Sequence, residues 1–283
     1  MLAGLLGVGG GIIVVPVLFT MLGLIDVAES VRMHVAVGTS LASIVLTSLV
    51  SARSHHRRGA VDVELLRSWS LWIFIGSVAG TLLASANSGT TLSVVFGVVA
   101  LSVALYMALT RPDFKVRDGL PTGVLGASSG FGIGGLSAMM GIGGGTLCVP
   151  YFNAFGFPVH RAVGTAAAIG LIIALPAAIG FIISGWGIAA LPQASVGHVN
   201  LLGLVLIAPF TTPTAPLGVM LVHKLSPRAL KRTFAFSCSR LRHVCFFEAP
   251  LISAPKDRVG GLRLVLIRLN LRFRPTHVTL RNR

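Results

Sequence analysis

Long apolar runs separated by short polar segments dominate this chain. A membrane-spanning helix needs about 20 mostly apolar residues. The runs that meet this requirement without an internal charge are Val35–Ala52, Ser68–Ala86, Thr91–Thr110, Leu120–Met140, Ala162–Ser184 and Val199–Leu217. The pattern therefore predicts an all-α, polytopic integral membrane protein.

Two further apolar stretches are interrupted by glycine, and they repeat one phrase. Residues 7–16 read GVGGGIIVVP inside the run Leu2–Leu24, and residues 141–150 read GIGGGTLCVP. The second copy lies in Ile142–Phe157, which is short for a full span and favours a half-helix or a re-entrant segment. Duplicated halves that each carry a glycine-broken helix are typical of secondary transporters.

A second match follows each copy, because residues 37–40 (VGTS) recur as residues 163–166 (VGTA). The repeat divides the chain into two transmembrane pseudo-repeats, 1–118 and 119–232, followed by an atypical Arg-rich tail, 233–283. In this alignment the counterpart of Leu120–Gly134 falls upstream of Met1, so we expect the opening helix of the first half to be truncated. The tail is either a polybasic patch for anionic lipid or a segment without selected structure.

Composition and charge support a membrane location. Charged residues make up 11% of the chain, whereas soluble domains carry about 25%. The net charge of +15 comes largely from the end of the chain, since thirteen of the 23 Lys and Arg residues lie from Arg228 onward. A nucleic-acid partner is therefore not expected. The other basic residues gather in loops 53–67, 111–117 and 224–232, which the positive-inside rule places in the cytoplasm. We expect a multi-pass membrane protein. An even number of crossings between the last two loops requires the second glycine segment to traverse the membrane or dip deeply into it.

The glycine clusters are the candidate binding sites. Consecutive glycines weaken a helix and free backbone N–H groups. A helix that starts just after them directs the positive end of its dipole at whatever lies beyond. Two such starts facing each other would hold a small anion without lysine or arginine. The proposed substrate-binding residues are Gly9, Gly10, Gly11, Thr39, Ser40, Gly143, Gly144, Gly145, Asn153 and Thr165.

Each of these assignments has an alternative. The glycines would also permit close helix packing, and the hydroxyls of Thr39, Ser40 and Thr165 would also serve as caps. Duplication of the cluster, with a proline at the same offset, favours anion binding over packing. We expect Trp69, Trp72 and Trp186, and His34 with its repeat counterpart His160–Arg161, to mark the membrane interface, where loop-edge and aromatic residues gather. A gating or anion-attracting role is the alternative for the two histidine positions.

Other classes of function lack their residues. No Asp, Glu or Lys lies in the well-formed spans, which argues against a carboxylate proton relay. The three cysteines have no metal-ligand spacing, and the motifs HExxH and GxSxG are absent. We expect no enzyme activity, no metal and no cofactor. The alternatives to a transporter are an integral-membrane enzyme or scaffold, and an inactive truncated or frameshifted transporter.

The doubled phrase, with Pro16 and Pro150 at its ends, and residues 162–165 resemble the sulfite exporter TauE/SafE family of membrane transporters. The likeness extends from about Leu2 to Arg232 and departs from the family pattern at both ends. It implies a multi-pass bacterial inner-membrane permease with two repeated halves. The implied substrates are sulfite, sulfonates or related small organic anions.

Overall fold

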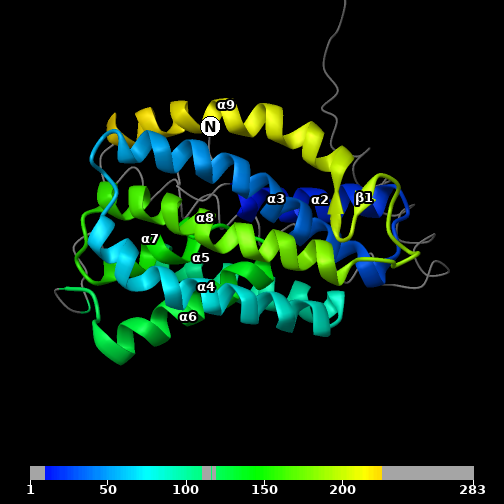
Figure 1. The fold of residues 1–283 in the computed structure, drawn as a ribbon, viewed down its shortest axis with the longest axis horizontal. Helices are drawn as coiled ribbons and strands as arrows, with labels where there is room; N and C mark the ends of the chain where they lie inside the picture. Colours follow the sequence, from blue (N-terminus) through cyan, green and yellow to red (C-terminus); the bar gives the residue numbers. More distant parts are fainter. Residues whose placement is uncertain (1–9, 110–115, 117–118, 225–283) are drawn as a thin grey trace, which may run out of the picture.

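The computed structural model describes residues 10–109, 116 and 119–224 (Figure 1). Apart from one hairpin of two short strands, the elements of the described chain are helices, so the predicted all-α class is confirmed. The elements are α2 (Gly11–Leu24), α3 (Glu29–His56), α4 (Val63–Ala86), α5 (Gly89–Leu109), α6 (Gly123–Met140), α7 (Gly145–Ala154), α8 (Val159–Ser184), β1 (Ser195–Val196), β2 (Val199–Asn200) and α9 (Leu201–Lys224). The tail, 233–283, lies outside the described residues, as does the segment before Gly10.

Each uninterrupted apolar run became a helix. Within the described residues, α3, α4, α6 and α8 are long and apolar enough to cross a membrane, and α2, α5 and α9 contribute shorter apolar segments. Helix α3 is longer than the predicted Val35–Ala52 at both ends. It begins at Glu29, whose carboxylate suits a helix N-terminus, and its last turn contains Arg53, which suits a C-terminus.

The two longest helices form the centre of the molecule. Helices α3 and α8 pack against each other and run in opposite directions, as the colours in Figure 1 show. Helix α4 packs on α8 and on α6, and α9 packs on α3. The short helices follow the same scheme, since α2 packs on α3 and α7 on α8. The segments that carry the repeated phrases therefore occupy equivalent places on oppositely directed helices.

The two ends of this bundle differ in charge. We call the end that contains the α3–α4 connection the basic end, because Arg53, Arg57, Arg58 and Arg67 are exposed there. We call the opposite end, which contains β1 and β2, the hairpin end. The turn between α2 and α3 lies at the hairpin end and carries Asp26 and Glu29.

The second glycine segment dips into the bundle and returns. The N–H of Val116 donates to the carbonyl of Ala154 at 2.7 Å, and that of Gly119 donates to Phe155 at 3.1 Å. These bonds place the end of α7 beside the start of α6, at the basic end. Helices α6 and α7 together therefore form a re-entrant pair, and α8 starts again from the basic end, which gives the even crossing number that the loop charges require.

Glycines hold α4 against α6. A Cβ atom at Gly76 would lie 2.8 Å from the Cα of Phe131, and one at Gly80 would lie 2.6 Å from the Cα of Gly135. Both distances are shorter than any real Cβ contact. Trp69 also belongs to this contact, so its predicted interfacial role is wrong: it is buried, and its ring lies 5.5 Å from that of Phe152.

We expect Gly80→Ala to lower the free energy of unfolding by about 1–3 kcal/mol, because the added methyl group forces α4 and α6 apart. The measurement is thermal or denaturant unfolding of the purified protein in detergent micelles. Gly97→Ala is the control, because Gly97 also lies within a helix but a Cβ atom there would meet no heavy atom of a neighbouring element within 4 Å. Equal stability of the two variants would contradict the close packing of α4 on α6.

Candidate functional site

The start of α2 meets the turn between α6 and α7 inside the protein. A Cβ atom at Gly11, the first residue of α2, would lie 2.8 Å from the Cα of Ile142 and would collide with the carbonyl oxygen of Gly141. Residues 141–146 are all buried. Gly141 adopts a left-handed conformation with φ of 66°, which glycine alone adopts without strain. The structure thus brings the two glycine turns into direct backbone contact.

Neither helix start has a side-chain cap. The N-cap residues are Gly10 and Gly144, which have no side chain to accept a first-turn N–H. The carbonyl of Gly10 accepts from Ile13 and Val14 at 2.9 and 3.0 Å, as expected for the first intrahelical bonds. The starts of α2 and α7 are therefore both buried, and their first-turn N–H groups have no side-chain cap.

The predicted glycines are distributed as follows. Gly10 and Gly11 begin α2, Gly143 and Gly144 lie in the turn before α7, and Gly145 is the first residue of α7. Gly9 lies outside the described residues. Close packing, which the sequence left open as an alternative, is confirmed for Gly11 and for Gly144, where a Cβ would lie 2.8 Å from Ile169 Cγ2.

Thr39 and Thr165 make equivalent contacts at opposite ends of the bundle. The hydroxyl of Thr39 accepts from the N–H of Asn200 at 2.9 Å, and that of Thr165 accepts from the N–H of Asp62 at 2.9 Å. The glycine before each threonine has no side chain, which lets the neighbouring loop approach closely. A Cβ at Gly38 would be 3.1 Å from the carbonyl carbon of His198. Both hydroxyls therefore anchor a loop that leads into the next helix.

Asp62 and Asn200 are capping residues that the sequence analysis did not identify. Asp62 Oδ1 accepts from the N–H of Leu65 at 3.0 Å, and Asn200 Oδ1 accepts from the N–H of Gly203 at 2.8 Å. Each caps the start of a long helix, α4 or α9. Asp62 follows the VGT phrase of α3 and Asn200 follows that of α8, at different distances along the chain. Alignment of the two repeats therefore did not point to either residue.

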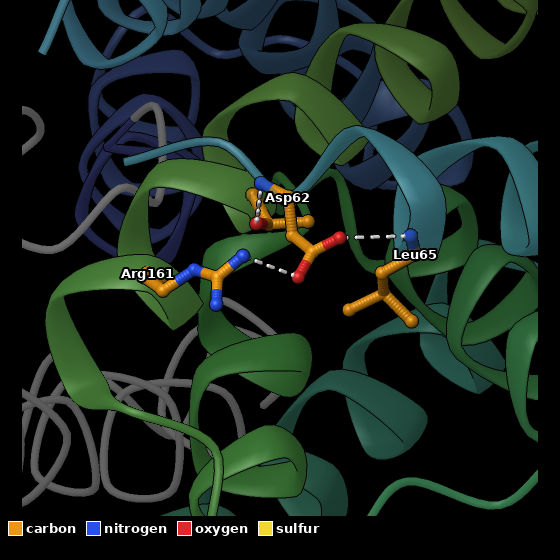
Figure 2. A network of polar contacts seen from close by, with 4 residues as sticks. Asp62, Leu65 and Arg161 are labelled. Carbon is orange, nitrogen blue, oxygen red and sulfur yellow. Dashed lines mark hydrogen bonds and ion pairs between the residues drawn. The ribbon is translucent and has the colours of Figure 1, made fainter. Parts of the chain in front are cut away.

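At the basic end the threonine contact is extended by an ion pair. Figure 2 shows Asp62 between Leu65 and Arg161, whose Nη2 donates to Asp62 Oδ2 at 2.7 Å. The side chain of Arg161 is 51% exposed and that of Asp62 is 16% exposed. Solvent therefore screens the pair, and its contribution to stability is about 0–1 kcal/mol.

At the hairpin end a pair of buried histidines lies beside the equivalent contact. The rings of His34 and His198 are 5.1 Å apart between centroids. His34 Nε2 lies 3.1 Å from the carbonyl oxygens of Ala84 and Asn87, so it donates its proton to this end of α4. The expectation that His34 marks the interface is wrong, because it is 6% exposed and contacts the end of α4 and the β1–β2 turn. Burial lowers the pKa of His198 to about 4, and His34 acts in the same direction.

The remaining polar candidates, Ser40 and Asn153, lie in different parts of the bundle. Ser40 Oγ donates to the carbonyl of Gly141 at 2.7 Å and thereby ties α3 to the second glycine turn. Asn153 is different, because it lies near the end of α7 at the basic end. Eight residues of helix, or roughly 12 Å, separate it from Gly145. The structure therefore does not bring Asn153 to the glycine turns.

Comparison with known proteins identifies the family. Residues 1–239 match sulfite exporter TauE/SafE. The chain belongs to this family. It is 32% identical over 234 residues to a probable membrane transporter protein of Haemophilus influenzae, covering 83% of this chain and 89% of that protein. It is 28% identical to the probable membrane transporter protein YunE of Bacillus subtilis, covering 80% and 85%, and 27% identical to a probable membrane transporter protein of Methanocaldococcus jannaschii, covering 81% and 85%. No solved structure is significantly similar to the chain. This TauE/SafE protein is thus a multi-pass membrane transporter.

We expect Asp62→Ala to destabilise the protein by about 1–2 kcal/mol, mainly through loss of the helix cap. Asp62→Asn should cost less, because the amide oxygen still caps α4 and only the screened ion pair is lost. Unfolding in detergent micelles measures both variants. If Asp62→Asn proved as damaging as Asp62→Ala, the charge rather than the cap would be the main contribution.

We expect the stability of the protein to fall as the pH falls from about 6.5 to about 4. In this window the unfolded chain takes up a proton at His198 and the folded chain does not, so the difference reaches on the order of 3 kcal/mol. Melting temperatures of the wild type and of His198→Gln, measured across this range, give the effect. His56→Gln is the control, since His56 is exposed. Identical pH profiles for the wild type and His198→Gln would contradict the assignment.

Proposed function

We propose that this protein is a secondary transporter that moves a small anion, such as sulfite or a sulfonate, across the cytoplasmic membrane by alternating access. The observation that supports the proposal is the contact of the start of α2, at Gly11, with the buried α6–α7 turn at Gly141 and Ile142, with glycine at the N-caps of both α2 and α7. Buried N-termini favour negative charge. The family name and the membership of the chain support a sulfur oxyanion as substrate.

The arrangement of the helices supports alternating access. We propose that residues 1–118 and 119–232 form two repeats of opposite orientation, because α3 and α8 run in opposite directions and carry the same VGT phrase. In transporters of this kind the substrate site lies where the repeats meet, and rocking of one repeat against the other exposes it to each side in turn. The two glycine turns are in contact in this structure, so admission of the anion requires them to separate.

The charge of the two ends supports an orientation. We propose that the basic end faces the cytoplasm, because the exposed arginines of the α3–α4 connection lie there. The connection before α6 agrees with this orientation, because Val116 in that connection bonds to Ala154 at the end of α7, which lies at the basic end. The hairpin end then faces away from the cytoplasm.

The test is anion flux through the purified chain in proteoliposomes. We expect saturable uptake of radiolabelled sulfite or of an organosulfonate, with competition by related oxyanions and no uptake of an uncharged solute of similar size. Empty liposomes are the control. Absence of flux for every small oxyanion would overturn the proposal and favour an inactive chain, whereas chemical turnover without net movement would favour a membrane enzyme.

A further inference from the structure

The two glycine turns share their glycine spacing in the sequence but differ in neighbouring side chains. In the register of the repeat, Thr146 in the second turn corresponds to Ile12 in the first. On the long helices, Gly170 of α8 corresponds to Ile44 of α3. At these two positions the first repeat has aliphatic side chains, whereas the second has a hydroxyl group and no side chain.

The hydroxyl of Thr146 has no partner in the described part of the protein. Thr146 is fully buried, and its Oγ1 makes no hydrogen bond. Some other buried hydroxyls bond to their own helix: Ser43 donates to the carbonyl of Ser40, and Thr81 to that of Ser77, both at 2.8 Å. A buried polar group without a partner is unfavourable, so a hydroxyl left unsatisfied in the uncapped first turn of α7 suits a ligand that accepts from it.

A second unpartnered hydroxyl precedes the same turn. Ser137, in the last turn of α6, is fully buried and its Oγ makes no hydrogen bond within the described residues. The position that corresponds to Ser137 in the first repeat is Ala3. Unsatisfied hydroxyls therefore lie on both sides of Gly141–Gly145, and the repeat places apolar residues at the matching positions of the first turn.

Further polar atoms converge on the start of α7. A Cβ atom at Gly170 would lie 2.9 Å from Ser48 Oγ and 3.4 Å from the amide nitrogen of Gly144. Both atoms therefore face the same point on α8, and no side chain fits between them. At the first turn, by contrast, Ile44 Cδ1 lies 2.9 Å from the position of a Cβ at Gly11 and fills the equivalent place.

We propose that the start of α7 alone is the anion-binding site, with the hydroxyl of Thr146 and the amides of Gly144–Thr146 as its donors. The first turn then serves as the packed wall against which the site closes. The inference rests on the proposed anion transport and makes it specific. Amide and hydroxyl donors without a fixed cation suit an oxyanion, which presents several acceptor oxygens.

Substitution of Thr146 tests the assignment. Thr146→Val removes the hydroxyl and keeps the shape of the side chain, and we expect it to weaken sulfite binding by about 10-fold to 100-fold, the effect of losing one hydrogen bond to a charged ligand. Thr146→Ser keeps the hydroxyl and should stay within about 3-fold of the wild type, well below that loss. Ile12→Val is the matched change at the first turn and should leave binding unchanged. Binding of radiolabelled sulfite to the detergent-solubilised full chain is measured by scintillation proximity, and flux is measured in proteoliposomes.

The outcomes separate this inference from the proposed function. If the wild type binds and transports sulfite and Thr146→Val does so equally well, the inference fails and the transport function stands. Equal losses in Ile12→Val and Thr146→Val would show that both turns bind, which also overturns it. If the wild type moves no oxyanion, the proposed function fails. Should Thr146→Val not fold, as judged by gel filtration and melting temperature, Ser48→Ala replaces it, with Ser43→Ala on the same helix as its control.

Discussion

The constraint on which this structure depends is that main chain which leaves a helix at membrane depth must find its partners within the protein. Helices α2 and α7 both start in the interior, where Ser40 of α3 donates to the carbonyl of Gly141 in the α6–α7 turn. The two ends of the bundle are joined in a similar way: Thr39 of α3 accepts from Asn200 before α9, and Thr165 of α8 accepts from Asp62 before α4. Under the proposed division into two repeats, each long central helix thus supports the start of a helix from the other repeat.

This exchange has a consequence for how the molecule moves. The two threonine contacts lie at opposite ends, so under the proposed mechanism each must loosen when its own end opens. They are reinforced differently, by a partly exposed ion pair at the basic end and by a pair of buried histidines at the hairpin end. Salt screens an exposed ion pair, whereas acid acts on a buried histidine. The two ends of the bundle should therefore respond to different solution conditions.

Much of the architecture was predictable from the sequence, because span length and the absence of charge are local properties. The apolar runs gave the helices, and the duplicated phrase located the two broken segments. The contacts of the site were harder to predict. Thr39 and Thr165 were proposed as ligand contacts or caps, but they hold loops whose capping residues, Asp62 and Asn200, lie at unequal distances along the chain. The sequence placed Asn153 at the site because it lies in the broken segment. In the structure it lies near the end of α7, at the basic end and away from the glycine turns.

The repeat also explains why the sequence favoured a symmetric site. Residues that are identical in both copies stand out first, and here they include glycines such as Gly11 and Gly141, where main chain touches main chain. Such positions tolerate no side chain, so packing alone is enough to preserve them in each copy. A single small anion, however, does not need two identical half-sites. The copies differ at Thr146 against Ile12 and at Gly170 against Ile44, and at the first of these the second copy has a buried hydroxyl without a partner among the described residues, which the proposed anion would satisfy.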